Sequence, residues 1–338
     1  MIRESLNRLI RREDLREEEM SALMGEIMSG NATDAQIGAV MAALATKGET
    51  FSELAGAARA MRRKATRIQT NADVVVDTCG TGGDSLNTFN ISTTAAFVVA
   101  GCGVTVAKHG NRSVSSKCGS ADLLEALGAN LEVGPEVVEE AVREIGIGFL
   151  FAPKFHGAMR HAAKARRELG VRSIFNMLGP LTNPAGANCQ LIGVYAPALT
   201  EMFAQALKLL GARRALVVHG HEGLDEISVC APTRISELNN GMIRTFDITP
   251  EQLIGRTAAK EEMTGGDPVE NAVITRKILE GDKGPRRDVV VVNAGAALVA
   301  AGVAADFARG IAMAEAAIDQ GGAMRKLDEL VRFTNSNN

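Results

Sequence analysis

Two segments of the chain combine glycines, polar side chains and a lysine in a way that suits phosphate binding. Asp77-Thr-Cys-Gly-Thr-Gly-Gly-Asp84 follows an apolar, β-branched run at 73–77, and Lys108-His-Gly-Asn-Arg-Ser113 follows a similar run at 104–107. Between them, residues 92–101 are small and apolar and predict a helix. Both loops and the helix N-terminus are therefore expected at one edge of a parallel sheet. Close backbone approach at glycines, unpaired N–H groups and the helix dipole predict an anionic, phosphorylated ligand there.

The glycine loop does not match the common nucleotide-binding motifs. A dinucleotide fingerprint would place a third glycine at Ser85, and a P-loop would have Lys-Ser or Lys-Thr where the chain has Asp84. Glycine-rich turns also follow strands for steric reasons, so this run alone is weak support for a ligand. An acidic residue inside a phosphate loop indicates a bound cation or a sugar hydroxyl partner.

The composition predicts an ordinary globular protein. The 338 residues are 46% hydrophobic with a formal net charge of −3, enough chain for one large or two modest domains. This balance argues against nucleic acid or an anionic membrane as the main partner. The one basic cluster, at 59–67, is interpreted as a solvated face near a helix C-terminus. Without a long uncharged apolar run or an apolar signal core, no membrane span is expected and the cytoplasm is the default location.

The five cysteines are scattered along the chain, with no Cys-x-x-Cys pair. This arrangement argues against a disulfide framework or a zinc site and for a reducing compartment. Cys79 and Cys118 lie in the glycine-rich segments, but the sequence places no histidine to activate either thiol. We therefore interpret both as small packing residues.

Residues 1 to about 70 are predicted to be entirely helical. Apolar residues recur at helical spacing in four stretches. Thr33 caps the third helix, Gly48 ends it, and Thr50-Phe-Ser-Glu53 opens the fourth as a capping box. The four helices form a small bundle, in which the methionines are interpreted as core residues.

From about residue 72 the pattern changes to an alternation of strands and helices. Strands are predicted at 73–77, 104–107, 190–195, 214–219 and 288–293, and helices at 120–128, 135–145, 199–210 and 303–319. This alternation indicates an α/β fold with a largely parallel sheet. Because the segment from Phe155 to Pro184 interrupts the alternation, we predict a helical domain at 1–70, joined by part of about 156–184 as a hinge, and an α/β domain at 71–338.

Seven motifs occur in a fixed order along the chain. They are Gly80-Thr-Gly-Gly-Asp84, Asn90-Ile-Ser-Thr93, Lys108-His-Gly-Asn-Arg-Ser113, Gly119-Ser-Ala-Asp122, Arg166-Arg-Glu-Leu-Gly170, Phe175-Asn-Met-Leu-Gly-Pro-Leu-Thr-Asn-Pro184 and Gly223-Leu-Asp-Glu226. On these motifs the chain closely resembles the anthranilate phosphoribosyltransferase family over nearly its full length. The resemblance implies a nucleoside-phosphorylase/phosphoribosyltransferase-like α/β fold with an all-α N-terminal domain and a mostly parallel central sheet. It also implies a homodimer through the helical domain.

The resemblance implies a reaction of tryptophan biosynthesis. The phosphoribosyl group of 5-phosphoribosyl 1-pyrophosphate moves to the amine of anthranilate, giving N-(5-phosphoribosyl)anthranilate and pyrophosphate, with two Mg²⁺ ions per site. The aromatic amine is neutral at pH 7 and attacks without a strong base, whereas loss of pyrophosphate builds oxocarbenium charge. Cations and oriented donors stabilise that charge separation, so motifs rich in anion binders and poor in nucleophiles suit this chemistry.

The resemblance also implies three groups of site residues. For the phosphoribosyl pyrophosphate they are Gly80, Thr81, Gly82, Gly83, Asp84, Thr88, Asn90, Ser92, Thr93, Lys108 and Ser120. For anthranilate they are Gly80, Asn111, Arg166, His109, His156, Gly179 and Pro180. For magnesium they are Ser92, Asp225 and Glu226. Without the resemblance, the two acids would be interpreted as solvated loop residues and Arg166 as a surface charge, although the paired donors of an arginine suit a carboxylate.

Two other functions remain as alternatives. Pyrimidine-nucleoside phosphorylases share the architecture but lack the signatures at 108–113 and 175–184. A non-catalytic relative that binds nucleic acid would have a strongly basic surface and would lose substrate or metal residues. The negative net charge and the presence of Arg166, Asp225 and Glu226 argue against that second alternative.

Overall fold

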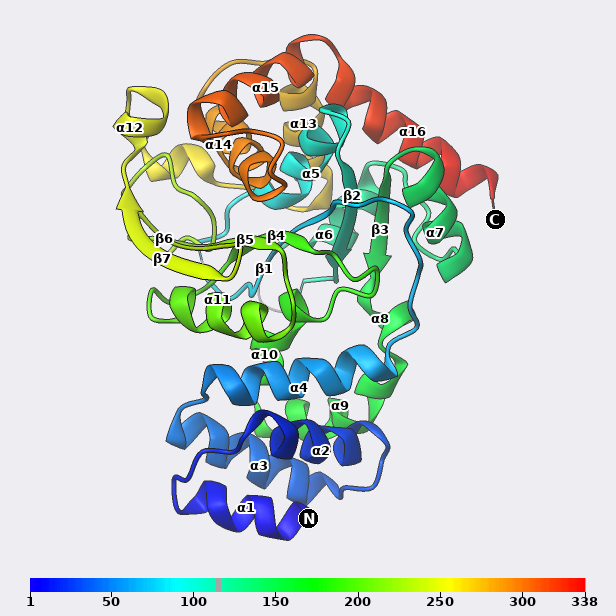
Figure 1. Cartoon of the computed structure of the whole chain (residues 1–338). Coiled ribbons are helices and arrows are strands. Elements are labelled where there is room, and N and C mark those ends of the chain that lie inside the picture. Colours follow the sequence, from blue (N-terminus) through cyan, green and yellow to red (C-terminus); the bar gives the residue numbers. More distant parts are fainter. Residues whose placement is uncertain (85, 114–116, 338) are drawn as a thin grey trace.

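The computed structural model describes residues 1–84, 86–113 and 117–337, in which a helical bundle lies beside an α/β unit (Figure 1). The bundle is formed by α1 (Ile2–Ile10), α2 (Glu17–Met28), α3 (Asp34–Lys47) and α4 (Phe51–Lys64). The strands are β1 (Val75–Gly80), β2 (Thr105–Gly110), β3 (Ile147–Phe151), β4 (Cys189–Gly193), β5 (Arg214–Gly220), β6 (Thr233–Asn239) and β7 (Met242–Ile248).

The other helices follow or connect these strands. They are α5 (Ile91–Gly101), α6 (Ser120–Ala126), α7 (Pro135–Glu144), α8 (Ala152–Phe155), α9 (Arg160–Leu169), α10 (Phe175–Leu178), α11 (Leu199–Leu209), α12 (Pro250–Ile254), α13 (Pro268–Leu279), α14 (Pro285–Ala300), α15 (Phe307–Asp319) and α16 (Gly322–Ser336). Short 3₁₀ turns lie at Gly157–Met159, Gly179–Leu181 and Lys260–Met263.

Capping residues set the bounds of the bundle helices, as predicted. Thr33 Oγ1 accepts a hydrogen bond from the Gln36 N–H at 3.2 Å, and Thr50 Oγ1 accepts one from the Glu53 N–H at 3.2 Å. Several methionines are buried in the bundle core, among them Met20, Met24, Met28 and Met41. Helix α9 contributes Ala162 and Ala165 to the same core and packs on α2 and α3, so a segment much later in the chain completes the bundle.

The seven strands form one sheet in the order β3-β2-β1-β4-β5-β6-β7. Strands β1 to β5 run parallel and β6 and β7 run antiparallel, which confirms the largely parallel sheet. The chain moves outward from β1 to β3, returns to β4 beside β1, and then moves outward in the other direction. The carboxyl ends of β1 and β4 therefore flank a topological switch point, where ligands of parallel sheets commonly bind.

Alternate side chains along the strands serve two hydrophobic layers. On β5, Leu216 and Val218 belong to the core with α5 and α13 to α16, whereas Ala215 and Val217 belong to the core with α11 and the bundle. Figure 1 shows α11 between the sheet and α4, and these two helices are in contact. The sheet thus lies between two helical layers, and the bundle lies against one of them.

The strand predicted at 288–293 is wrong, because this run lies inside α14. The valines at 289–292 are each at most 2% exposed. A helix buried on all sides has no polar stripe, so its apolar run resembles a buried strand. Strands β3, β6 and β7 were not predicted: β3 contains Gly148, and in the other two the apolar residues do not follow the period of two that indicates a strand. The helix predicted at 303–319 begins only at Phe307.

The strands next to the predicted loops are also longer than expected. Strand β1 extends to Gly80 and β2 to Gly110, so Cys79, Lys108 and His109 lie on strands rather than in loops. Burial raises the pKa of the Cys79 thiol well above its ordinary value, in agreement with a packing role. All five cysteines lie in the described part of the chain, and none of them forms a disulfide.

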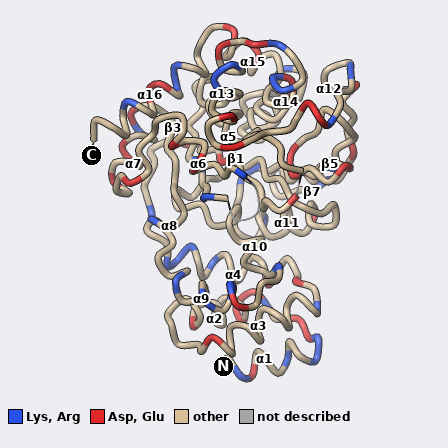
Figure 2. The backbone as a smooth tube through the Cα atoms, turned by 180° about the vertical axis from the view of Figure 1, so that it is seen from behind, with Lys and Arg blue, Asp and Glu red and all other residues tan. Residues whose placement is uncertain are grey.

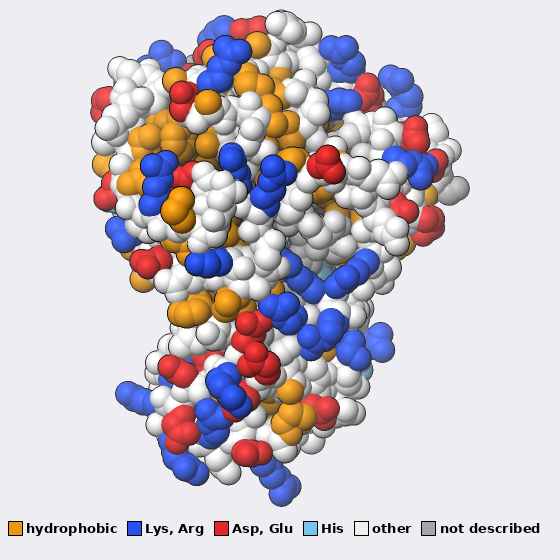
Figure 3. Space-filling view, in the orientation of Figure 1, with side chains coloured by type: hydrophobic (Ala, Val, Ile, Leu, Met, Phe, Trp, Pro, Cys, Tyr) orange, Lys and Arg blue, Asp and Glu red, His pale blue; other side chains and the backbone are white. Residues whose placement is uncertain are grey.

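The basic cluster at 59–67 was predicted to be a solvated face, and one of its residues is not fully solvated. Arg59, Arg63, Lys64 and Arg67 are exposed, but Arg62 is half-buried and its Nε donates to the Leu181 carbonyl at 2.7 Å. Burial lowers the pKa of Arg62 to about 10. Figure 3 shows basic side chains gathered where the bundle meets the α/β unit, whereas charges of both signs are interspersed on the backbone trace seen from behind (Figure 2).

No helix in the described part of the chain combines the length and the apolar character needed to cross a bilayer.

Candidate active site

Two glycines at the switch point allow a third chain segment to approach the sheet. Gly80 at the end of β1 pairs with Gly193 at the end of β4. A Cβ atom on Gly193 would overlap the backbone carbonyl of Asp225, and one on Gly80 would lie 2.5 Å from Asp225 Oδ2. Asp225 therefore rests directly on this glycine pair, and its position depends on the absence of side chains there.

The glycine loop after β1 also contacts the Asp225 carboxylate. Gly82 and Gly83 have φ of +64° and +80°, a backbone region that favours glycine. The Gly82 N–H donates to Asp225 Oδ2 at 2.9 Å, and the Thr81 N–H donates to the Gly193 carbonyl at 2.9 Å. The loop is thus attached to β4 and to Asp225 at the carboxyl edge of the sheet.

Glu226 connects this edge to the N-terminus of α5. Its Oε1 accepts the Ser92 N–H at 3.1 Å, and the residue is 9% exposed. Burial raises the pKa of Asp225 and of Glu226 far above their ordinary values. The nearby Asp84 raises the pKa of Asp225 further, and Asp225 does the same to Glu226, against the opposing charge of Lys108. These are not the solvated loop acids of the alternative interpretation.

The donor set around this acidic group fits a hard divalent cation. Asp84, Asp225 and Glu226 supply carboxylate oxygens, and the Ser92 side chain hydrogen-bonds to Glu226. The described residues include no ready-made cage of three or more His, Cys, Asp or Glu side chains. Magnesium usually binds one or two carboxylates together with substrate phosphates rather than such a cage. A cation would also relieve the repulsion that raises these pKa values.

Lys108 and Asp77 fix the two central strands to each other. Lys108 is 4% exposed and its Nζ donates to the Thr78 carbonyl. Asp77 is fully buried and accepts the His109 N–H at 3.1 Å and the Asn183 Nδ2 at 2.8 Å. Burial raises the pKa of Asp77, and Lys108 opposes this shift. Sequence analysis missed Asp77 and Asn183 as site-forming residues, although a carboxylate inside an apolar strand was a visible signal.

Two of the predicted histidines form a buried pair. The ring centroids of His109 and His156 lie 5.0 Å apart, and His109 Nδ1 lies 3.1 Å from the Gly179 carbonyl, which it faces as a donor. Burial lowers the pKa of His109 to about 3 and that of His156 to about 4, so both rings are neutral at pH 7. Within the described part of the chain, the Nε2 atoms of both rings are buried without a hydrogen-bond partner. Each of these nitrogen atoms can accept a hydrogen bond from a ligand.

Other predicted residues contact partners of their own. Ser120 Oγ donates to the Asn111 carbonyl at 3.3 Å, so these two belong together. The guanidinium of Arg166 is half-buried and lies 5.3 Å from the centroid of the Phe175 ring. Burial lowers the pKa of Arg166. Pro180 is buried, and its carbonyl accepts the Gln190 side chain at 2.8 Å.

Three predicted donor-site residues are engaged in the protein's own packing. Thr88 forms an isolated bridge with Thr264. The Asn90 side chain donates to the Cys118 carbonyl at 3.1 Å and accepts from Asn271 at 3.0 Å. The Thr93 side chain is buried, at 1% exposure. For Thr93, a ligand contact would require the backbone rather than the hydroxyl group.

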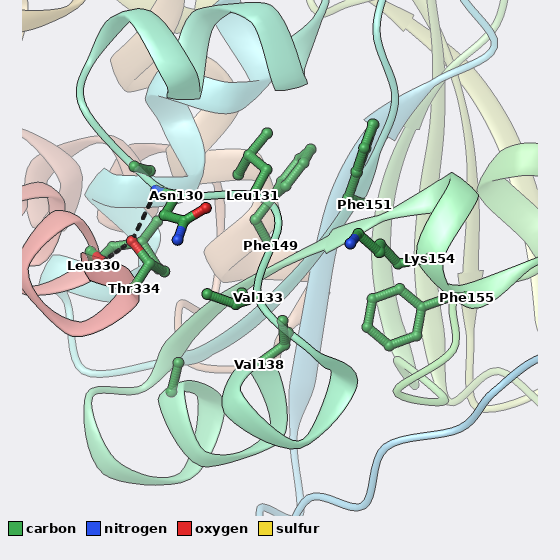
Figure 4. Close-up of a pocket in the computed structure, with 12 residues that line it drawn as sticks. Asn130, Leu131, Val133, Val138, Phe149, Phe151, Lys154, Phe155, Leu330 and Thr334 are labelled. Carbon is green, nitrogen blue, oxygen red and sulfur yellow. Dashed lines mark hydrogen bonds between the residues drawn. The ribbon is translucent and has the colours of Figure 1, made fainter. Parts of the chain in front are cut away.

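A pocket elsewhere in the molecule has a different character (Figure 4). It lies among α7, β3 and α16, has an empty volume of about 380 Å³ including open solvent, and is lined mainly by apolar side chains such as Phe149 and Leu131. Its one cationic side chain, Lys154, is paired with Glu132 at 2.7 Å. None of the predicted site residues lines it, so the candidate active site is the polar edge at β1 and β4.

Comparison with known proteins agrees with this architecture. The helical bundle domain of a glycosyl transferase family matches residues 3–65, and the a/b domain of a glycosyl transferase family matches residues 72–324. The anthranilate phosphoribosyltransferase of Syntrophobacter fumaroxidans is 72% identical over 337 residues, covering 100% of both chains.

Solved structures give the same result. The anthranilate phosphoribosyltransferase of Thermus thermophilus superposes with a TM-score of 0.93 at 44% identity, covering 98% of this chain and 99% of that one. The Saccharomyces cerevisiae enzyme in complex with PRPP (phosphoribosyl pyrophosphate) and Mg superposes with a TM-score of 0.90 at 28% identity, covering 99% and 98%. Because the similarity extends over the whole chain and both domain models match in order, the protein belongs to the anthranilate phosphoribosyltransferase family.

Proposed function

We propose that this enzyme transfers the phosphoribosyl group of phosphoribosyl pyrophosphate to the amine of anthranilate, releasing pyrophosphate. One observation carries the proposal: Asp225 and Glu226 bind the N–H groups of Gly82 and Ser92, and so hold the glycine loop and the α5 N-terminus together. Anion-binding N–H groups and cation-binding carboxylates then share one edge of the sheet, as a magnesium–pyrophosphate ligand requires.

On the donor side, the glycine loop and the start of α5 receive the pyrophosphate and ribose. We assign this role to Gly80, Thr81, Gly82, Gly83, Asp84, Thr88, Asn90, Ser92, Thr93, Lys108 and Ser120. The buried ammonium of Lys108 favours negative charge at this edge. We further propose two magnesium ions per site, held by Ser92, Asp225 and Glu226; when bound, they stabilise the charge that develops on the leaving pyrophosphate.

On the acceptor side, we place anthranilate among Gly80, Asn111, Arg166, His109, His156, Gly179 and Pro180. The guanidinium of Arg166 offers paired donors for the carboxylate. The neutral rings of His109 and His156 have unpaired Nε2 atoms that can accept hydrogen bonds from the amine. Since the aromatic amine is already neutral at pH 7, the chain's main task is to orient it toward the anomeric carbon.

We propose two domains, 1–70 with part of about 156–184 and 71–338. Several chain segments pass from one domain to the other side by side. The Thr66 N–H donates to the Phe155 carbonyl at 2.9 Å, and the Ile68 N–H donates to the Pro184 carbonyl at 3.3 Å. We place the hinge in these connecting segments, and closure about them would bring Arg166 toward the donor site. We also propose a homodimer through the helical domain and a cytoplasmic location; the lack of a disulfide among the five cysteines favours the latter.

The direct test follows anthranilate fluorescence with purified protein, phosphoribosyl pyrophosphate and magnesium, with EDTA as control. We expect a magnesium-dependent loss of signal that matches pyrophosphate release in amount. A folded protein that binds the donor but leaves anthranilate unchanged would contradict the acceptor assignment. Other amines and nucleobases would then be screened.

Arg166→Ala is expected to raise the KM for anthranilate about tenfold or more, because a hydrogen bond to a charged group contributes about 1.5–3 kcal/mol. The KM for phosphoribosyl pyrophosphate should stay near the wild-type value. Steady-state kinetics with each substrate varied in turn measure both constants. Arg167→Ala, at an exposed neighbouring position, is the matched control. An unchanged KM for anthranilate would remove Arg166 from the acceptor site.

The affinity for magnesium is expected to fall as the pH is lowered from about 8 to about 6. The pKa of Asp225 is raised to about 7 and that of Glu226 to about 8, so protons compete with the cation in this range. Each proton displaced can change the apparent affinity by up to about tenfold per pH unit. Calorimetric titration of the protein with magnesium measures the effect. The double variant Asp225→Asn, Glu226→Gln should lose both the binding and its pH dependence.

A further inference from the structure

Arg172 connects the hinge segment to the glycine loop. It lies in the turn between α9 and α10, and its Nη2 donates to the Gly83 carbonyl at 3.0 Å. The guanidinium carbon lies 3.9 Å from the centroid of the Tyr195 ring, just beyond the end of β4. The guanidinium also hydrogen-bonds to the Tyr195 hydroxyl, and because Arg172 is exposed, other N–H groups remain available on the solvent side. Neither the glycine motif nor the proposed list of site residues contains this arginine.

The contact with Gly83 sets the direction of one peptide group in the loop. In a trans peptide the carbonyl of Gly83 and the N–H of Asp84 point to opposite sides. By holding the carbonyl oxygen, Arg172 turns the Asp84 N–H away from itself. A carbonyl oxygen that faced an anion would repel it, whereas here the oxygen is occupied by a cation. A Cβ on Gly83 would lie 2.9 Å from Arg172 Nη2, so this approach also requires a glycine.

Tyr195 links both ends of the loop to β4. Its backbone N–H donates to Thr81 Oγ1 at 3.2 Å, and its ring carries the guanidinium that holds Gly83. A planar guanidinium stacked on an aromatic face loses little further freedom when it forms hydrogen bonds. The loop from Thr81 to Gly83 is thus held at its start by the backbone of Tyr195 and at its end by Arg172.

We infer that Arg172, stacked on Tyr195, is a positioning residue for the pyrophosphate of the donor substrate, acting through the Gly83 carbonyl. The inference rests on the proposed function for the identity of that substrate. Arg172 also adds a positive charge beside the loop, and it comes from the segment that carries Arg166. Arg172 lies six residues after Arg166, so the donor loop contacts the segment that directly follows the acceptor-side helix α9.

The test compares Arg172→Ala with wild-type enzyme. We expect the KM and the directly measured Kd for phosphoribosyl pyrophosphate to rise about tenfold, with the KM for anthranilate changed less than about twofold. Arg172→Lys should fall between the two, because an ammonium keeps the charge but does not lie flat on the ring. Tyr195→Leu should resemble Arg172→Ala because it removes the ring face, and Tyr195→Phe should lie between wild type and Tyr195→Leu because the Tyr195 hydroxyl also hydrogen-bonds to the guanidinium. Arg167→Ala should leave both constants unchanged.

A donor Kd that is unchanged in Arg172→Ala would overturn the inference, as would equal increases in both KM values. The Kd does not depend on turnover. A wild-type protein that binds the donor but does not consume anthranilate would therefore contradict the proposed acceptor, while the ratio of donor Kd values would still decide the role of Arg172.

Discussion

Replacement of Asp225 by Asn together with Glu226 by Gln is expected to lower kcat/KM by about 10²–10³-fold, the range found when a group that stabilises transition-state charge is removed. The two amides keep the shape of the side chains but lose the charges that we propose to bind magnesium. Initial rates over a range of magnesium concentrations measure the effect. Added magnesium should not restore the rate.

The same variant should be more stable than wild type when both are free of metal. The pKa values of both acids are raised in the folded protein, so the folded state binds protons more tightly than the unfolded chain. Their ionisation therefore lowers stability as the pH rises through these values, and neutral amides avoid that cost. Thermal unfolding in EDTA at about pH 8 should give a higher Tm for the variant. Glu261→Gln, at an exposed position, should change neither rate nor Tm. A normal rate, or a lowered Tm in EDTA, would contradict the proposed role of the pair.

Gly193→Ala is expected to lower kcat/KM by about 10²-fold, the loss that a displacement of about 1 Å in a catalytic group can cause. The added methyl group would overlap the backbone carbonyl of Asp225. Because backbone atoms on a packed strand have little room to move, the loop that carries the acid pair must shift. Kinetics and magnesium titration measure the result, and the affinity for magnesium should fall with the rate.

Gly38→Ala is the matched control for this substitution. Gly38 lies inside α3, and a methyl group on its Cα would meet no packed neighbour within 4 Å among the described residues. Alanine should therefore be tolerated there or should stabilise the helix slightly. Activity in Gly193→Ala close to the wild-type value would show that the acid pair does not need its close approach to the sheet.

The parts of the fold that were predictable from sequence are those with local signals. The caps at Thr33 and Thr50 and the helix from Pro135 each depend on residues a few positions apart. The strand predicted at 288–293 failed because Val289–Val292 are buried on every side, which removes the periodicity that distinguishes a helix. Whether such a run is helix or strand is decided by the elements around it.

The arrangement of the candidate site was predictable where several of the proposed residues share one motif. The glycine loop and the α5 N-terminus do meet at the sheet edge, and Ser92 does lie against Glu226. The environments of single residues were not predictable: burial of the Thr93 side chain and the position of Arg62 depend on contacts between distant segments. The contacts of Arg172 were not predictable either, because its partners, Gly83 and Tyr195, lie far from it in sequence.

The completion of the bundle by α9 has a consequence for synthesis on the ribosome. Helices α1 to α4 emerge first, but the apolar surfaces of α2 and α3 that receive Ala162 and Ala165 remain uncovered until α9 has been translated. β1 and β2 are also made before that point. The nascent chain therefore exposes this apolar surface while it begins its sheet, and it is prone to aggregation until Leu169, at the end of α9, has left the exit tunnel.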